Sequence, residues 1–163
     1  MEHLLIINPY NSEHRDLITK FEKDNSIDES LSGLLNHINT SKELQDERKE
    51  SNIVDKDIAF IEKSEIKDIC HINGEKDRKT CQISFLGKYS KKYIKRFIIT
   101  VTEYAINNLG MLEVFINIDN MDKEIKNYLI SQGYEDLGTE NGKAIFLKEK
   151  EEINKELYYE TSR

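Results

Sequence analysis

Cysteine is scarce in this sequence, and its scarcity excludes one class of protein. The chain has 163 residues and only two cysteines, Cys70 and Cys81. Two are too few for the disulfide framework that holds small secreted domains together, and cytosolic disulfides are rare. We therefore expect both cysteines to be buried free thiols in neighbouring strands.

Long apolar runs are also missing. No run approaches the roughly 20 residues that a helix needs to cross a bilayer, so no membrane span is expected. The N-terminus, MEHLLIINPYNS, has a short apolar run but neither a basic region before it nor a small-residue cleavage site. It does not resemble a signal peptide, and the sequence predicts a cytoplasmic protein.

The chain also has less positive than negative charge, and its histidines are not clustered. The formal net charge is -7, which argues against general affinity for nucleic acid, because such binding depends on neutralising phosphates with Lys and Arg. The four histidines are scattered without ligand spacing, and Cys70-His71 alone does not make a metal site. Neither a nucleic-acid partner nor a metal is expected.

What the chain does have is the composition of one globular domain. Its length suits a single domain with a real core. Apolar residues make up 37% and charged residues 34% of the chain, which indicates a globular protein with a heavily charged surface.

Alternating strand and helix patterns begin at the N-terminus. Residues 4–7 are an apolar run typical of a strand, and Ser12 is placed to cap a helix. On that helix Leu17, Ile18 and Phe21 share one face. A capping-box pattern at Ser26 and Glu29 predicts a second amphipathic helix, with apolar residues up to Ile38. The polar stretch 40–52 is expected to be a solvated helix or a loop.

The middle of the chain turns to extended structure and then to one long helix. The three expected antiparallel strands are residues 58–61, 66–72 and 80–86. A polar turn is predicted to begin at Asn73-Gly74. From Ser90 the apolar residues recur at helical spacing, and Gly110 stands where the helix ends.

The last part repeats the alternation. Residues 112–118 are almost wholly apolar, as is typical of a central strand covered on both faces. A shorter helix is predicted for residues 123–132, followed by strands at 134–137 and 144–147. Residues 149–163 form a charged tail that is predicted to be helical.

This order of elements resembles the GNAT superfamily of acyl-CoA-dependent N-acyltransferases. The resemblance covers about residues 2–148 and is strongest from Phe85 to Tyr134. Counted back from Tyr104-Ala105 without gaps, the stretch YSKKYI falls on the family pattern WGKGYA, with Lys91 and Tyr93 matching directly. The resemblance implies an α/β (α+β) fold in which a mixed central sheet of about six to seven strands is flanked by helices.

The resemblance also implies acetyl-CoA as a cosubstrate. In the family, backbone amides of this loop bind the coenzyme pyrophosphate at a helix start, and the end of the preceding strand pairs with the coenzyme's amide arm. The expected cofactor-binding residues are Phe85, Leu86, Gly87, Lys88, Tyr89, Ser90, Lys91, Lys92, Tyr93 and Ile94.

The loop departs from the family pattern at its small residues. Ser90 and Lys92 replace two glycines, and Ile94 replaces a small final residue, so side chains at Lys92 and Ile94 could obstruct the approach of phosphate. Five cationic groups from Lys88 to Arg96 could instead supply charge. The lysines oppose the helix dipole, which favours a bound anion or, equally well, a nearby acidic patch. A solvated basic helix start is the alternative interpretation.

The shorter helix carries the second family landmark. Family members often have a tyrosine four residues before Gly-Phe, proposed to protonate the departing thiolate. Here Leu129 stands four residues before Gly133-Tyr134, and Tyr128 is one position away, rotated by about 100° on a helix. Tyr128 is the candidate catalytic residue, with a packing role as the alternative. Family members also often have an asparagine before this helix. Here Asp122 occupies the aligned place, and Asn120 precedes it. Glu62 and Glu65 are candidate general bases by location only.

Three functions remain open from the sequence. The first is an N-acyltransferase that moves an acetyl group from acetyl-CoA to an amine or protein acceptor, with a homodimer as a possible assembly. The second is a GNAT-fold binding or regulatory protein without catalysis. The third is an adaptor whose tail and polar segment contact a partner, which rests on composition alone.

Overall fold

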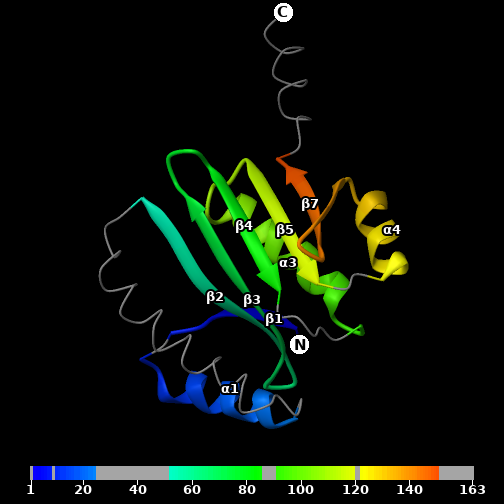
Figure 1. The fold of residues 1–163 in the computed structure, drawn as a ribbon. Helices are drawn as coiled ribbons and strands as arrows, with labels where there is room; N and C mark the ends of the chain where they lie inside the picture. Colours follow the sequence, from blue (N-terminus) through cyan, green and yellow to red (C-terminus); the bar gives the residue numbers. More distant parts are fainter. Residues whose placement is uncertain (1, 9, 25–51, 86–90, 120–121, 151–163) are drawn as a thin grey trace, which may run out of the picture.

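A seven-stranded mixed sheet organises the protein, with the strand order β1-β2-β3-β4-β5-β7-β6. This computed structural model describes residues 2–8, 10–24, 52–85, 91–119 and 122–150 (Figure 1). The strands are β1 (His3–Ile6), β2 (Ile53–Glu62), β3 (Glu65–Glu75), β4 (Thr80–Phe85), β5 (Glu113–Asp119), β6 (Glu135–Glu140) and β7 (Lys143–Glu149). The helices are α1 (Ser12–Asp24), α3 (Ile94–Asn107) and α4 (Lys123–Ser131).

Among the described strands, only one neighbouring pair is parallel. β4 and β5 run in the same direction, paired from Thr80 with Glu113 to Ser84 with Asn117, whereas every other neighbouring pair is antiparallel. A parallel pair needs a crossover connection, and α3 supplies it. The pairing ends one residue before β4 does, so Phe85 lies beyond the last paired position.

The two faces of the sheet are covered by different helices. α3 and α4 pack on one face, where the larger core includes Phe60, Ile83, Phe97 and Ile116. α1 packs on the opposite face, over β1, β2 and β3, with a smaller core that includes Ile18 and Phe21 (Figure 1). The alternation of side chains along each strand separates the two cores.

The expected order of elements is confirmed wherever the structure describes the chain, with shifted boundaries. β2 begins five residues earlier than expected, at Ile53, although Asp55, Lys56 and Asp57 make its start polar. β1 ends at Ile6 and β6 begins at Glu135, while the adjacent Ile7 and Tyr134 are buried. The predicted helix at 26–38, the polar stretch up to residue 51 and the tail beyond residue 150 lie outside the described residues.

The turn predicted at Asn73-Gly74 is wrong. β3 continues to Glu75, and the turn lies at residues 76–79, where Lys79 has a positive φ of 53°. Gly74 is instead a strand residue opposite Cys81, so close to β4 that a Cβ on it would meet the Thr80 carbonyl oxygen at 2.5 Å. The glycine allows a close approach of two backbones rather than a turn.

Helix boundaries correct two further predictions. The side chain of Asn11, not Ser12, accepts hydrogen bonds from the first turn of α1, through the Glu13 and His14 amides at 2.8 and 3.2 Å. α3 begins at Ile94 rather than Ser90, because residues 91–93 form a turn. Its end agrees with the prediction: Gly110 follows with a φ of +75°.

Within the described part of the chain, helices cover β5 on one face only. Val114, Ile116 and Ile118 are fully buried against α3, whereas Glu113, Phe115 and Asn117 point to the other face and keep part of their surface exposed. The prediction that both faces are covered is therefore wrong for the side chains of β5. An apolar run could not distinguish the two cases, since Phe115 is apolar as well.

Candidate functional site

An aromatic cluster places the start of α3 over the end of β4. The Phe97 ring packs edge-to-face on the Phe85 ring, with centroids 5.3 Å apart, and lies 5.3 Å from Phe60 on β2. Tyr93 lies 6.0 Å from Phe60 in the same cluster. Phe85 is the last residue of β4, and Tyr93 directly precedes α3. These contacts therefore hold the end of β4 next to the start of α3, and these two elements flank the predicted coenzyme loop.

Among the described residues, no side chain caps the first turn of α3. Tyr93 is the N-cap residue and makes no side-chain cap hydrogen bond, and the first turn contains no acidic residue. The N–H groups of a helix start need partners from outside the helix, and its dipole favours negative charge there. A helix start of this kind favours an anionic group over a cationic one.

The predicted cofactor-binding residues divide into three groups. Leu86, Gly87, Lys88, Tyr89 and Ser90 lie outside the described residues. Phe85, Tyr93 and Ile94 have side chains in the core, with exposed fractions of 6%, 8% and 0%, so only their backbones could contact a ligand. Ile94 therefore does not obstruct the phosphate approach with its side chain, contrary to expectation. Lys91 and Lys92 are exposed.

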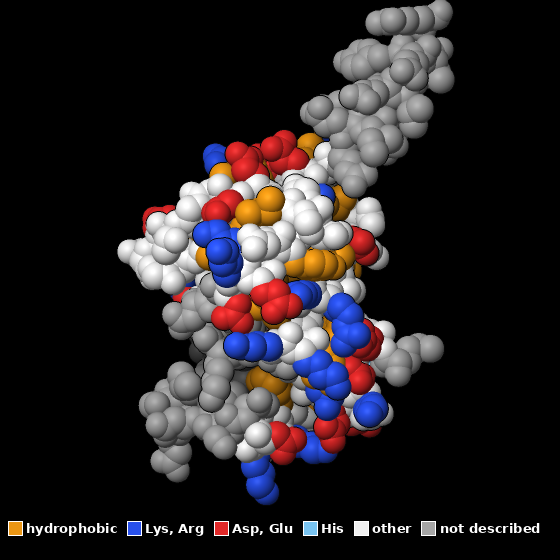
Figure 2. Space-filling view, turned by 90° about the vertical axis from the view of Figure 1, so that its right-hand side faces the viewer, with side chains coloured by type: hydrophobic (Ala, Val, Ile, Leu, Met, Phe, Trp, Pro, Cys, Tyr) orange, Lys and Arg blue, Asp and Glu red, His pale blue; other side chains and the backbone are white. Residues whose placement is uncertain are grey.

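Most of the cationic side chains that the structure describes at the start of α3 form ion pairs with acidic residues. Lys91 Nζ lies 3.2 Å from Asp122 Oδ2, and Lys95 Nζ lies 2.7 Å from Glu124 Oε1 at the start of α4. Arg96 contacts Glu2 at 2.7 Å. Figure 2, which views the side of the molecule that carries α4, shows blue and red side chains next to one another. The acidic patch considered from the sequence is present, and it comes from other elements.

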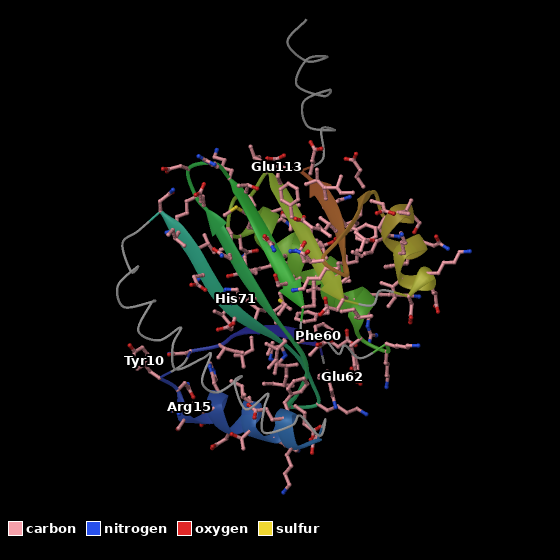
Figure 3. All side chains as sticks on the ribbon, viewed as in Figure 1. Tyr10, Arg15, Phe60, Glu62, His71 and Glu113 are labelled. Carbon is pink, nitrogen blue, oxygen red and sulfur yellow. The ribbon has the colours of Figure 1, made fainter. Side chains whose placement is uncertain are left out.

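Glu62 and Glu65 occupy different environments at the two ends of one hairpin turn. Glu62 Oε2 lies 4.0 Å from Arg96, so this carboxylate lies beside the first turn of α3 (Figure 3). Glu65 is bonded to Lys20 and Lys67, and the hydrogen bond from Lys20 above all holds its pKa below the ordinary value. A lowered pKa makes Glu65 a poorer base. Glu62 is the better placed of the two candidates.

Tyr128 lies next to the start of α3. It is partly buried against the larger core, and Lys95 Nζ lies over its ring, 5.3 Å from the centroid. Leu129, the residue at the family's tyrosine position, is fully buried. The rotation by one residue therefore turns Tyr128 toward the first turn of α3, while Leu129 faces the core.

A cluster of three ionisable side chains lies on the opposite face of the sheet and was not predicted from the sequence. His71 Nδ1 lies 2.8 Å from Asp57 Oδ1, and its Nε2 lies 2.9 Å from Asp55 Oδ1 (Figure 3). Asp57 pairs with His71 in the β2–β3 register, and His71 pairs with Ser84 near the end of β4. The alternation of Asp55 and Asp57 was visible in the sequence, but only the strand register shows their partner.

The described residues contain neither a candidate metal site nor a membrane-spanning helix. Within the described ranges, no group of three or more His, Cys, Asp or Glu side chains could hold a metal ion. In the same part of the chain, no helix is long and apolar enough to span a membrane.

Comparison with known proteins identifies the architecture. No family model and no curated protein matches the sequence. Solved structures do match: N-acetyltransferase PseH from Campylobacter jejuni has 12% identity, covering 92% of this chain and 99% of that one, with a TM-score of 0.61. PseH has also been solved in complex with acetyl coenzyme A.

Two further structures agree. Dodecameric spermidine N-acetyltransferase from Vibrio cholerae has 10% identity, covering 94% of this chain and 97% of that one, with a TM-score of 0.62. The N-acetyltransferase PaiA from Thermoplasma acidophilum, solved with coenzyme A, has 14% identity, 92% and 99% coverage and a TM-score of 0.55.

The chain has a GNAT-like fold. Seven strands in a mixed sheet, with helices on both faces, are what the resemblance implied, so the predicted fold class is confirmed. At these identities the likeness establishes the fold and not the activity.

Proposed function

We propose that this protein is an N-acyltransferase that transfers an acetyl group from acetyl-CoA to an amine. The observation that carries the proposal is the start of α3, which has an uncapped first turn without acidic residues and lies over the end of the only parallel strand pair among the described strands. Solved proteins of the same fold are N-acetyltransferases, and two of them have been solved with acetyl coenzyme A or coenzyme A.

In this proposal, one set of residues binds the coenzyme and another transfers protons. The backbone amides at the start of α3 would hold the phosphates, with Lys91 and Lys92 adding charge from the preceding turn. The coenzyme supplies an activated acetyl thioester when bound. The Tyr128 hydroxyl is the group we assign to donate a proton to the leaving thiolate sulfur, and Glu62 is the carboxylate best placed to accept a proton from the amine.

Calorimetric titration with acetyl-CoA and with CoA tests the binding step. We expect saturable heat, and an increase in the thermal midpoint at millimolar coenzyme, because a ligand that binds only the native state stabilises it. Absence of both effects would rule out the acyltransferase. Release of free CoA thiol in the presence of a panel of amines then tests turnover.

Charge reversal tests where the phosphates bind. The Lys91→Glu, Lys92→Glu double variant should weaken coenzyme binding at least tenfold, because it replaces two cations beside the phosphates with anions. The matched control is Lys76→Glu with Lys79→Glu, two exposed lysines of the β3–β4 turn. Equal affinity in the test and control variants would place the phosphates elsewhere.

The role of Tyr128 is tested separately. Tyr128→Phe should lower kcat by about 10²-fold or more, as removal of a general acid does, and leave coenzyme affinity unchanged. Full activity of the variant would leave Tyr128 only its packing role.

A binding protein without catalysis is the second candidate, favoured by the ion pairs. Asp122, Glu124 and Glu2 already neutralise three of the cations at the start of α3. This candidate predicts no thiol release for any amine of the panel, and it does not require coenzyme binding.

A further inference from the structure

A cavity of about 360 Å³ opens beside the second half of α3, away from the helix start described above. One wall is α3, with Ile99, Thr102 and Glu103. The opposite wall is formed by the α4–β6 connection and the end of β7 (Figure 1). Its volume is at the lower end of the range of small-molecule sites, which suits a compact ligand.

The base of the cavity contains a buried polar pair. Thr102 is 2% exposed and donates its hydroxyl proton to the Ile98 carbonyl oxygen at 2.7 Å. Tyr134 is 4% exposed and hydrogen-bonded to Thr102, and burial raises its pKa to about 12. A neutral phenol has one proton and two lone pairs, so the Tyr134 oxygen can accept a hydrogen bond from a ligand N–H group.

A lysine is held in place on the wall opposite α3. Lys148 Nζ donates a hydrogen bond to the Gln132 carbonyl oxygen at 2.8 Å and lies over the Tyr134 ring, 5.4 Å from its centroid. A Cβ at Gly133 would meet this ammonium group at 2.8 Å, so glycine leaves room for it. An ammonium group has three donors, and two of them remain for an anion.

The charges of the cavity lie on opposite walls. Glu103 projects from α3, and no ion pair involves it among the residues that the structure describes. Lys148 and Lys150 belong to the β7 side, together with Glu149. Two carboxylates and two ammonium groups balance, so the lining favours a ligand without net charge over an anion or a cation.

The apolar part of the lining suits a hydrocarbon side chain. Ile99 and Ile106 line the cavity from α3, and the Tyr134 ring lines it from the β6 side. The C-terminal end of α3 also lies here, at Asn107, where the helix dipole favours a positive group. A ligand with an ammonium group toward Glu103, a carboxylate toward Lys148 and an apolar side chain between them would complement all of these features.

We propose that this cavity binds a free α-amino acid with an apolar side chain. Its ammonium group contacts Glu103 and the Tyr134 oxygen, and its carboxylate contacts Lys148. The site lies on the other half of α3 from Lys91 and Tyr93, so it is separate from the proposed coenzyme site and does not depend on the proposed activity.

Titration with three related compounds tests this proposal. L-leucine carries both charges, L-leucinamide lacks the carboxylate, and 4-methylpentanoate lacks the ammonium group. We expect saturable heat with L-leucine and at least tenfold weaker binding of the other two, in the presence and in the absence of CoA. No saturable heat with L-leucine at millimolar concentrations, or equal binding of all three compounds, would overturn the proposal.

Substitution of Glu103 locates the ligand. Glu103→Gln should weaken the binding of L-leucine at least tenfold and leave the binding of 4-methylpentanoate unchanged. Of these two compounds only L-leucine has an ammonium group, and the variant removes the carboxylate that this group contacts. Glu103 is exposed, and an unchanged thermal midpoint confirms that the variant is folded. The matched control is Glu113→Gln, an exposed carboxylate on β5. If L-leucine binding survives Glu103→Gln but is lost in the Lys91→Glu, Lys92→Glu variant, the amino acid binds at the acyl-transfer site and the proposal is wrong.

Discussion

Gly74 shows how a single residue can have two structural explanations. Asn-Gly is a strong turn signal, because glycine and asparagine tolerate positive φ, yet here the pair lies within β3. The deciding fact is the distance to β4: a Cβ at Gly74 would lie 2.6 Å from the Cys81 Cβ. Such an approach depends on strand pairing between distant residues, and no local pattern records it.

Substitution of Gly74 tests this interpretation. Gly74→Ala should lower the free energy of unfolding by about 1–3 kcal/mol, because backbone atoms of Thr80 and Cys81 must move to admit the methyl group. Urea unfolding measures the change, with the exposed strand residue Gln82→Ala as control. A Gly74→Ala variant as stable as the parent would show that β3 and β4 are further apart.

The two buried thiols lead to a prediction on how the stability of the protein depends on pH in the alkaline range. Burial raises the pKa of Cys81 from 9.0 to about 12, and burial raises that of Cys70 well above 9.0. A raised pKa means that the native state keeps its proton while the unfolded chain loses it. The associated stability is therefore complete below pH 9 and is lost as the pH rises toward 12.

The slope of stability against pH should depend on Cys81. In Cys81→Ala the decline in the free energy of unfolding above pH 9 should be shallower than in the parent, by up to about 1.4 kcal/mol per pH unit. Urea unfolding at several pH values measures it. Identical slopes would mean that Cys81 has no raised pKa. Cys70, Tyr104 and Tyr134, whose pKa values burial also raises, remain in both proteins and contribute to the decline that persists.

At the scale of the element, α3 combines a predictable core face with an unpredictable charged end. Its apolar spacing predicted the buried stripe from Ile94 to Ala105, because that spacing is a local property. The partners of its cations could not be predicted. They come from α4 and from the N-terminus, which reach α3 only through the fold.

The ion pair between Lys91, in the turn before α3, and Asp122, the N-cap residue of α4, should compete with phosphate. Lys91 is largely exposed, and an exposed pair contributes only about 0.2–1 kcal/mol, so a bound phosphate could draw Lys91 away from Asp122. Asp122→Asn should therefore raise coenzyme affinity about two- to fivefold, while asparagine remains a suitable N-cap residue for α4. Calorimetry measures the change. Asp136→Asn, which removes the partner of Lys126, is the control, and it should not alter the affinity.

At the scale of the whole molecule, the order of elements carried most of the fold prediction. A third meander strand, a long helix and an apolar strand imply a parallel pair joined by a crossover, and the sheet has that pair at β4 and β5. The placement of β7 between β5 and β6 was not predicted, because strand order depends on pairing between residues far apart in the sequence. The candidate site was predicted as a segment of chain, whereas Glu62, Glu2 and Asp122 became its neighbours only through the assembled sheet.

The separation of the two cores leads to a last prediction, on coupling across the sheet. Phe97→Ala removes a ring that contacts Phe60 and Phe85, and it should cost about 3–5 kcal/mol of stability. It should also weaken coenzyme binding, because the same rings hold α3 over the end of β4. Ile18→Ala, in the smaller core under α1, should cost about 2–5 kcal/mol but leave coenzyme affinity unchanged. Urea unfolding and calorimetry on both variants separate the two effects. Equal loss of affinity in both would show that the sheet transmits changes from one face to the other.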